Sequence, residues 1–256
     1  MILIKLGGSV ITDKSEYRKY RKDTVSRLCR EIKASGKDVM IVHGAGSFGH
    51  ILAKKFELQK GYVRKDQIDA AAKVSLDVRE LNAMVVSELI AAGIPAVSIP
   101  TGSCFLMDGG ELLMNDTEIL RRYSELGIVP VMFGDVVLDR KKGFGICSGD
   151  RIMEYLCDIF RPETAVFVSD VDGLYDRDPK VTKNAKLIPY VNEDILERIP
   201  EETTVSDVTG GVCAKMRAML DLCAEGRDCI LVNGTADGRL GSLLKGEKVV
   251  CTTARR

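Results

Sequence analysis

Short apolar runs alternate along the chain with longer stretches in which apolar residues recur every three or four positions. An apolar run bounded by turn-forming residues is typical of a buried strand, and the three- to four-residue spacing is typical of a helix with one buried face. The apolar runs predict strands at 1–6, 38–44, 94–99, 127–134, 164–170 and 228–234. The amphipathic stretches predict helices near 22–35, 67–92, 117–126, 150–159, 192–199 and 211–225.

This alternation is typical of parallel strands joined by crossover helices, so the predicted fold class is α/β, a three-layer αβα sandwich with a central, mostly parallel sheet. Two segments break the alternation. Residues 101–115 and 136–147 contain the glycine-rich turns DGG and KKG, and they predict hairpins that form a lid or one wall of a pocket. Pro162 predicts a hinge between an N-terminal lobe, 1–160, and a C-terminal lobe, 161–256, although one continuous sheet would join the lobes into a single domain.

Composition narrows the classes of function. The 256 residues include 37 basic and 37 acidic side chains, so no net charge attracts nucleic acid and any anion site is local. No apolar run reaches the roughly 20 residues that cross a bilayer, and the N-terminal residues MILIKLGGS do not have the pattern of a signal peptide, which predicts a cytoplasmic protein with no membrane partner. Eight cysteines without a C-x-x-C pair and only two histidines predict buried, reduced thiols and no metal-ligating residues.

The segment GAGSFG, residues 44–49, matches the glycine pattern of dinucleotide-binding proteins. A dinucleotide site also needs a second strand that leads to an acidic residue about 20 positions later. Asp66 and Asp69 stand near that distance, but they open a predicted helix, and an earlier strand already ends in the glycine turn KLGGS, residues 5–9. Two glycine turns therefore favour a phosphate site over a nicotinamide site, because glycine lets backbone amides approach anions closely.

A third glycine-rich segment is DVTGGVCAKM, residues 207–216. Thr209 is suited to cap a helix, Gly210 and Gly211 expose backbone amides, and Lys215 follows near the first turn. Three such anion sites on one fold point to a polyphosphate ligand. The chain contains neither the P-loop motif nor the HRD and DFG motifs of protein kinases, which excludes both of those classes.

Four cationic side chains stand near these segments: Lys5, Lys14, His50 and Lys215. A single lysine is usually a solvated surface charge, and a single histidine is often only a satisfied polar group. Lys5, however, follows an apolar strand, and His50 follows a glycine turn at a predicted helix start. For both positions, contact with a substrate anion is the favoured interpretation.

Three carboxylates complete the set of candidates. Asp150 stands at the head of a predicted helix, and Asp170 and Asp172 follow a buried strand. Such carboxylates can hold nucleotide hydroxyls, orient lysines or reach Mg²⁺ through water, but Asp150 is equally well explained as a helix N-cap. An EF-hand calcium loop is excluded, because Tyr175 stands where that loop needs glycine.

Together, these motifs resemble the amino acid kinase superfamily, and within it the isopentenyl phosphate kinases. The resemblance covers essentially the whole chain and rests on KLGGSVITDK, HGAGSFGH, FGDVV, SGD, SDVDGLY and DVTGGVCAKM. It implies the amino acid kinase-like fold, a homodimer, and transfer of the γ-phosphoryl group of ATP, with Mg²⁺, to isopentenyl phosphate. Ser169 and Val212 depart from the residues common in the family, and the segments after Lys14 and His50 follow it less closely.

The resemblance also assigns roles to individual residues. It implies that the catalytic residues are Lys5, Lys14 and His50, with Lys14 stabilising the transition state. It implies that the acceptor phosphate contacts Ala45, His50 and Gly149. It implies that ATP contacts Lys5, Leu6, Gly7, Gly8, Ser9, Gly46, Asp170, Tyr175, Gly211 and Lys215.

The residue chemistry agrees with a phosphate acceptor. A phosphate is already an anionic nucleophile near neutral pH, so its attack needs positioning and positive charge but no general base. Lys14 and His50 bring such charge to the predicted acceptor region. Two alternatives remain open: a sister kinase of another small phosphate or phosphonate such as fosfomycin, and a non-catalytic nucleotide-binding module.

An isoprenyl tail would also need an apolar pocket beside the cations. The predicted helix at 68–93 carries a stripe of apolar residues at helical spacing, which either lines such a pocket or packs in the core. Core packing is the favoured interpretation. The stripe consists of Val74, Val78, Leu81 and Val85.

Overall fold

The computed structural model describes residues 1–114, 117–177, 182–199, 211–223 and 227–255. The strands are β1 (Ile2–Leu6), β2 (Thr12–Asp13), β3 (Lys19–Tyr20), β4 (Val39–His43), β5 (Ala96–Ser98), β6 (Phe105–Asp108), β7 (Glu111–Met114), β8 (Val129–Phe133), β9 (Asp135–Asp139), β10 (Gly143–Cys147), β11 (Thr164–Ser169), β12 (Leu174–Tyr175), β13 (Leu187–Ile188), β14 (Tyr190–Val191), β15 (Asp228–Asn233) and β16 (Cys251–Ala254). The helices are α1 (Gly8–Ile11), α2 (Lys22–Ser35), α3 (Gly46–Lys55), α4 (Asp66–Ala91), α5 (Thr101–Cys104), α6 (Glu118–Glu125), α7 (Gly149–Phe160), α8 (Glu193–Glu197), α9 (Gly211–Leu222) and α10 (Arg239–Leu244), with a 3-10 turn η1 at Leu58–Lys60.

Every strand and helix predicted from the hydrophobic pattern is present, and the ends differ by a few residues. The predicted end of the last helix, residues 224–225, lies outside the described residues. The pattern did not resolve α1 or α10 because they have only four and six residues, too few to show a helical period. It also missed β16, an edge strand that pairs antiparallel with β15.

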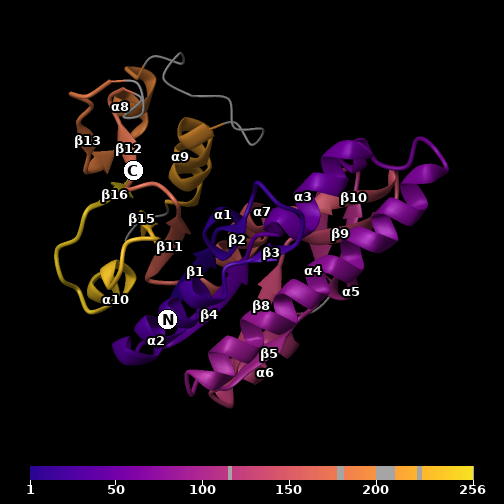
Figure 1. Ribbon diagram of the computed structural model, residues 1–256, viewed down its shortest axis with the longest axis horizontal. Coiled ribbons are helices and arrows are strands. Elements are labelled where there is room, and N and C mark those ends of the chain that lie inside the picture. Colours follow the sequence, from indigo (N-terminus) through magenta and orange to yellow (C-terminus); the bar gives the residue numbers. More distant parts are fainter. Residues whose placement is uncertain (115–116, 178–181, 200–210, 224–226, 256) are drawn as a thin grey trace.

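In the described ranges, the central sheet has eight strands in the order β14-β16-β15-β11-β1-β4-β8-β5 (Figure 1). β1 lies in its middle and pairs in parallel with β11 on one side and with β4 on the other. The predicted α/β class with a mostly parallel sheet is confirmed. Because parallel strands end at the same edge of a sheet, the segments that follow β1, β4 and β11 meet there.

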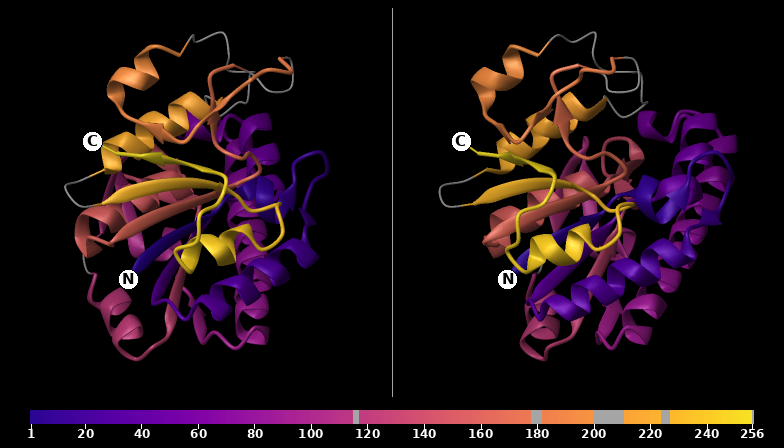
Figure 2. Two further views of the ribbon diagram at one scale, coloured as in Figure 1. Left: turned by 90° about the vertical axis from the view of Figure 1, so that its left-hand side faces the viewer. Right: turned by 60° about the vertical axis from the view of Figure 1, so that its left-hand side comes forward.

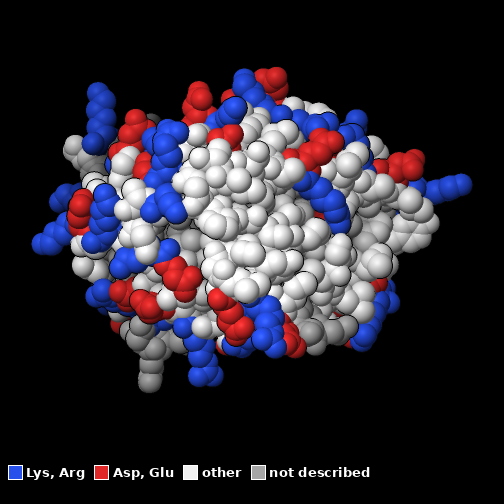
Figure 3. Space-filling view, turned by 90° about the horizontal axis from the view of Figure 1, so that it is seen from below, with Lys and Arg blue, Asp and Glu red and all other residues white. Residues whose placement is uncertain are grey.

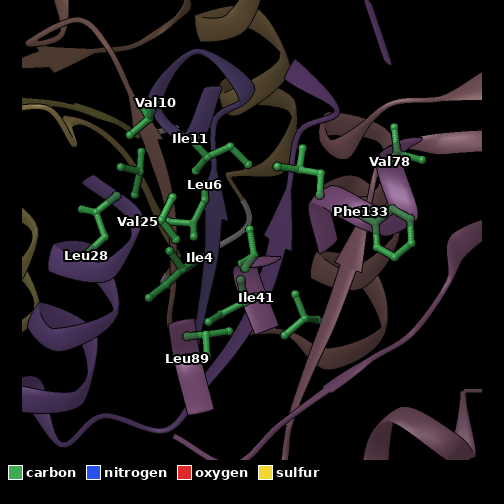
Figure 4. Close-up of a cluster of buried hydrophobic side chains, with 14 of the residues drawn as sticks. Ile4, Leu6, Val10, Ile11, Val25, Leu28, Ile41, Val78, Leu89 and Phe133 are labelled. Atoms are coloured by element: carbon green, nitrogen blue, oxygen red, sulfur yellow. The ribbon is translucent and has the colours of Figure 1, made fainter. Parts of the chain in front are cut away.

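Helices cover both faces of this sheet and bury one hydrophobic cluster on each (Figure 2). α2, α3, α4 and α10 cover one face, and α6, α7 and α9 cover the other. Side chains of β1 alternate between the clusters: Ile4 and Leu6 face the first, Leu3 the second. Figure 4 shows Ile4, Leu6 and Ile41 among residues such as Val25 and Leu89. Each fully buried aliphatic side chain contributes about 1.5–3 kcal/mol to folding.

The two predicted hairpins are present and pair in a second sheet, in the order β10-β9-β6-β7. The carboxylate of Asp139 joins their turns, because it accepts backbone hydrogen bonds from Gly109 at 3.0 Å, Gly110 at 2.7 Å, and Lys141 and Lys142 at 2.8 Å. Burial opposes the charge, but these four hydrogen bonds prevail and lower the pKa of Asp139 to about 2. Asp139 therefore ties the turns of the two hairpins together.

Both predicted lobes contribute strands to the central sheet. β11 begins two residues after Pro162 and pairs along its length with β1, so the proposed hinge leads directly into the shared sheet. The division into 1–160 and 161–256 stays a prediction. In the part of the chain that the structure describes, no helix is both long and apolar enough to span a membrane.

Candidate active site

The first two glycine turns follow β1 and β4, and they touch each other. The N–H of Gly44 donates to the carbonyl of Leu6 at 3.0 Å, and a Cβ added to Gly8 would lie 2.6 Å from the nitrogen of Gly46. Gly46 also has a φ of +50°, in the left-handed region that favours glycine. Glycine at these positions lets the backbones of the two turns meet, so the first residues of α1 and α3 lie side by side.

A cavity of about 300 Å³ lies at this edge of the sheet. Of the two hairpins predicted to form a lid or one wall of a pocket, the second contributes Ile146 and Cys147 to the cavity wall, next to Asp135. Residues 101–114, the described part of the first hairpin, do not line this cavity. The wall also contains most of the residues predicted to bind ATP, to bind the acceptor phosphate or to act in catalysis, namely Lys5, Gly7, Gly8, Ser9, Lys14, Ala45, His50, Gly149, Asp170 and Lys215.

Lys5 reaches this cavity from the central strand of the sheet. The residue is only 7% exposed, and its ammonium forms an ion pair with Asp150 in the first turn of α7. Asp150 is not the N-cap of that helix: the hydroxyl of Ser148 caps it and accepts the N–H of Arg151 at 3.2 Å. Of the two interpretations of Asp150, the structure thus supports a carboxylate that orients a lysine.

A second group of polar side chains continues along the ends of β1 and β11. Lys215 of α9 donates to the hydroxyl of Ser169 at 3.1 Å, and Ser9 donates to the carboxylate of Asp170 at 2.7 Å. Burial, and next the charge of Lys5, lower the pKa of Lys215 below its ordinary value. A polyphosphate in the cavity would therefore meet two ammonium groups close enough to influence each other electrostatically.

The pKa of Asp170 responds to the same surroundings. Partial burial would raise it, but the hydrogen bond from Ser9 and the charges of Lys14 and Lys215 lower it below the ordinary value. Asp170 is therefore ionised at neutral pH and faces the lysines across the cavity. This arrangement balances part of the positive charge when no anion is bound.

Lys14 and His50 come from separate elements and line the same cavity. Lys14 lies in the turn between β2 and β3, and His50 lies in α3, one turn after the glycine loop. Both side chains are exposed, so an acceptor molecule can reach them. Their catalytic roles stay predictions, but the shared cavity that those roles need is present.

Three residues assigned to ATP do not reach the cavity wall in the described part of the chain. The side chain of Leu6 is fully buried in the core, and Gly46 is covered by Thr12. The hydroxyl of Tyr175 donates to Asp172 at 3.4 Å, outside the cavity. Leu6 and Gly46 take part in the backbone contacts between the glycine turns. Contact between ATP and Leu6, Gly46 or Tyr175 stays a prediction.

The third glycine segment is described only in part. Gly211 is the first residue of α9, the helix that carries Lys215 to the cavity. Thr209 and Gly210, predicted to cap this helix and to expose amides, lie outside the described residues. Contact between ATP and Gly211 stays a prediction.

The other histidine of the glycine motif, His43, has a structural role. Its ring is fully buried, stacks on Phe133 at 5.4 Å, and lies 3.0 Å from the carbonyl of Gly44 and 3.1 Å from the amide nitrogen of Asn82. Burial lowers the pKa of His43 to about 4, although the Gly44 carbonyl opposes this. His43 is therefore neutral, and its contact with the Gly44 carbonyl supports the glycine turn.

The apolar stripe of α4 packs in the core, as favoured, and one member also reaches the site. Val78, Leu81 and Val85 are fully buried in the first hydrophobic cluster. Val74 belongs to the same cluster but also lines the cavity, together with Ala53. The cavity thus has an apolar part beside His50.

Sequence reasoning missed Asp135, which is 2% exposed on the cavity wall. Its carboxylate pairs with Arg79 at 3.1 Å and accepts the N–H of Val136 at 2.8 Å. Burial raises the pKa of Asp135, and the charge of Arg79 opposes that rise. An aspartate inside the apolar segment FGDVV was the available signal, because a charge in such a segment is rarely buried without a partner.

Comparisons with known proteins agree with this geometry. The sequence model of the amino acid kinase family matches residues 1–233. The isopentenyl phosphate kinase of Methanothermobacter thermautotrophicus is 37% identical over 97% of each chain, and that of Thermoplasma acidophilum is 36% identical over the whole of both chains. A crystal structure of isopentenyl phosphate kinase superposes with a TM-score of 0.85 at 32% identity and covers 99% of each chain. The chain therefore belongs to the amino acid kinase family, and within it to the isopentenyl phosphate kinases.

Proposed function

We propose that this protein transfers the γ-phosphoryl group of ATP to isopentenyl phosphate and forms isopentenyl diphosphate. The observation that carries the proposal is one cavity lined by Lys5, Lys14, His50 and Lys215, with an apolar part beside the histidine. Four cationic side chains suit two phosphorylated molecules that repel each other. The chain's membership of the isopentenyl phosphate kinases supports the same substrate.

Each group has a role that follows from its position. Lys5, Lys215 and the amides of the first glycine turn hold the ATP phosphates, because they line the cavity around the end of β1. His50, with Ala45 and Gly149, holds the acceptor phosphate. Lys14 neutralises charge on the phosphoryl group as it moves between them, and no residue needs to remove a proton from the acceptor.

Mg²⁺ enters this proposal with ATP. In the described ranges, no group of three or more His, Cys, Asp or Glu side chains is arranged to hold a metal ion. Asp150 is paired with Lys5, and Asp170 accepts a hydrogen bond from Ser9, so Asp170 is the carboxylate better suited to reach the cation through water. When bound, Mg²⁺ neutralises phosphate charge during transfer.

The experiment is an assay of the purified protein with ATP, with and without Mg²⁺, against isopentenyl phosphate, dimethylallyl phosphate, fosfomycin and UMP. Diphosphate formed from the isoprenyl compounds, only with Mg²⁺, is the expected result. Selective phosphorylation of fosfomycin would replace the proposal by a sister kinase. Nucleotide binding without turnover of any acceptor would replace it by a binding module.

We also propose that the protein is a homodimer, as the family resemblance implies. Figure 3 shows a broad area without Lys, Arg, Asp or Glu in the middle of the face seen from below, with charged side chains gathered around it. A face of this kind, with an uncharged centre and a charged rim, is typical of protein interfaces.

A further inference from the structure

The turn that carries Lys14 is not part of either large sheet. It connects β2 and β3, which have two residues each and pair only with each other. Asp13 shapes the turn locally, since its Oδ1 accepts the N–H of Ser15 at 3.0 Å and the hydroxyl of Ser15 at 2.6 Å. A ribbon of two-residue strands is too short to hold its own position. Contacts from other elements must set where the turn lies.

The strongest of these contacts converge on Asp77 of α4. The hydroxyl of Tyr17 donates to Oδ2 of Asp77, and Arg18 lies 3.4 Å from Oδ1. Lys73, one turn earlier on α4, also donates to Oδ1. The side chain of Asp77 is 0% exposed. Two of its three partners therefore come from the segment directly after Lys14.

The rest of the hairpin strengthens this attachment. Arg18 also pairs with Glu80 on the next turn of α4, and its guanidinium lies 5.6 Å from the centroid of the Phe48 ring in α3. Burial, and next the hydrogen bond to Asp77, raise the pKa of Tyr17 to about 12. The phenol therefore stays protonated and remains a donor over the whole physiological range.

Asp77 is not needed to hold α4 in the fold. Val78, Leu81 and Val85 already bury that helix in the core, and a buried carboxylate with partners is often no more stabilising than an apolar residue of similar size. Nor does Asp77 touch a substrate, because it is absent from the cavity wall, whereas Val74, one turn away, lies on it. One helix thus contributes Val74 to the cavity wall and anchors the hairpin that carries Lys14.

We infer that Asp77 is a positioning residue for phosphoryl transfer: through Tyr17 and Arg18 it holds the β2–β3 hairpin so that Lys14 stays at the cavity. The expected effect on kcat rests on the proposed function. The attachment of the hairpin to Asp77 does not depend on that function. Positioning matters here because a displacement of about 1 Å at a reacting group can lower a rate about 10²-fold.

The kinetic test uses Tyr17→Phe, which removes one hydroxyl, and Asp77→Asn, which removes the charge and keeps the size. Each is expected to lower kcat about 10- to 100-fold and to leave KM for ATP unchanged, because Asp150 and Ser169, which lie outside the hairpin, hold Lys5 and Lys215. Tyr190→Phe on β14 is the matched control, since this tyrosine is 56% exposed and does not line the cavity, and it should retain wild-type kcat.

A double-mutant cycle separates positioning from general stability. If the hairpin acts through Lys14, Tyr17→Phe should have little further effect on kcat in a Lys14→Ala background. An equal loss in both backgrounds would overturn the inference. So would a wild-type kcat in Tyr17→Phe.

A second measurement does not depend on turnover. Amide hydrogen exchange of residues 12–20 should be faster in Tyr17→Phe and Asp77→Asn, while exchange in α2 and β4 stays as in the wild type. If wild-type protein shows no transfer to isopentenyl phosphate, the proposed function is wrong. The exchange measurement still tests whether Asp77 holds the hairpin, because it does not depend on turnover. Unchanged exchange in both variants would show that Asp77 does not hold the hairpin.

Discussion

At the scale of single residues, Lys14 and His50 meet from separate elements at one cavity. We predict that Lys14→Ala and His50→Ala each lower kcat about 10²- to 10³-fold, because each removes a charged or hydrogen-bonding group aimed at the phosphates. Both side chains are exposed, so unfolding midpoints should stay near the wild-type value. Steady-state kinetics and thermal unfolding measure the two effects.

The matched control is Lys245→Ala, which removes an exposed lysine at the end of α10. It should retain wild-type turnover. Wild-type turnover of isopentenyl phosphate by His50→Ala would mean that the histidine does not bind the acceptor.

His43 predicts a dependence of stability on pH. The unfolded chain takes up a proton as the pH falls through 6.5, whereas the folded protein, with a His43 pKa of about 4, does not. The free energy of unfolding should therefore decrease as the pH falls from 6.5 toward 4, with a contribution of about 2 kcal/mol lost at pH 5. Urea unfolding at pH 7 and pH 5 measures this loss.

The variant His43→Gln isolates the contribution, because all other titrating groups are shared with the wild type. At pH 7, the free energy of unfolding of His43→Gln should be lower than that of the wild type. Between pH 7 and pH 5, however, the variant should lose about 2 kcal/mol less than the wild type does. An identical loss in both proteins would show that His43 is not responsible.

At the scale of elements, Thr12 joins the hairpin to both glycine turns. Its fully buried hydroxyl donates to the carbonyl of Gly8 at 2.7 Å and accepts the N–H of Ser47 at 2.9 Å. Thr12→Val keeps the shape but leaves both backbone groups unpaired, so we predict a loss of about 1–3 kcal/mol in the free energy of unfolding. Chemical denaturation measures this loss.

Thr235→Val makes the same chemical change at an exposed threonine. It should lower the free energy of unfolding by well under half of the loss expected for Thr12→Val. Because Thr12 lies between α1, α3 and the turn with Lys14, Thr12→Val should also reduce kcat. Equal stability losses in the two variants would argue that the Thr12 hydroxyl does not tie these elements together.

At the scale of the whole molecule, the predicted homodimer is open to direct measurement. Leu76 and Ile90 on α4 and Leu138 on β9 are 52%, 57% and 65% exposed, and α4 packs against β9. Burial of such side chains is a common source of subunit affinity. Light scattering should give the mass of two 28.1 kDa chains, and Leu138→Lys should weaken the dimer. The mass of a single chain for the wild type would contradict the prediction.

Much of the candidate site was predictable because its residues belong to local motifs. Lys5 lies near the end of β1, Gly8 lies in the glycine turn after it, and His50 and Lys215 follow glycine turns. Parallel strands bring such segments to one edge of the sheet. Contacts distant in sequence were not predictable. The pairing of Lys5 with Asp150 joins positions 145 residues apart, and nothing in the segment CSGD distinguishes such a carboxylate from an N-cap.

The amino-acid sequence by itself determined the α/β class, the order of the main elements and the phosphate chemistry. Periodicity and short glycine motifs involve residues that are close together in the sequence, so they can be recognised without the fold. Only the tertiary structure decided which side chains share the cavity. It separated the buried His43 from the exposed His50, although both lie in one motif. It also brought Asp77 under Tyr17, 60 residues away, because side-chain surroundings depend on how elements pack and not on their spacing along the chain.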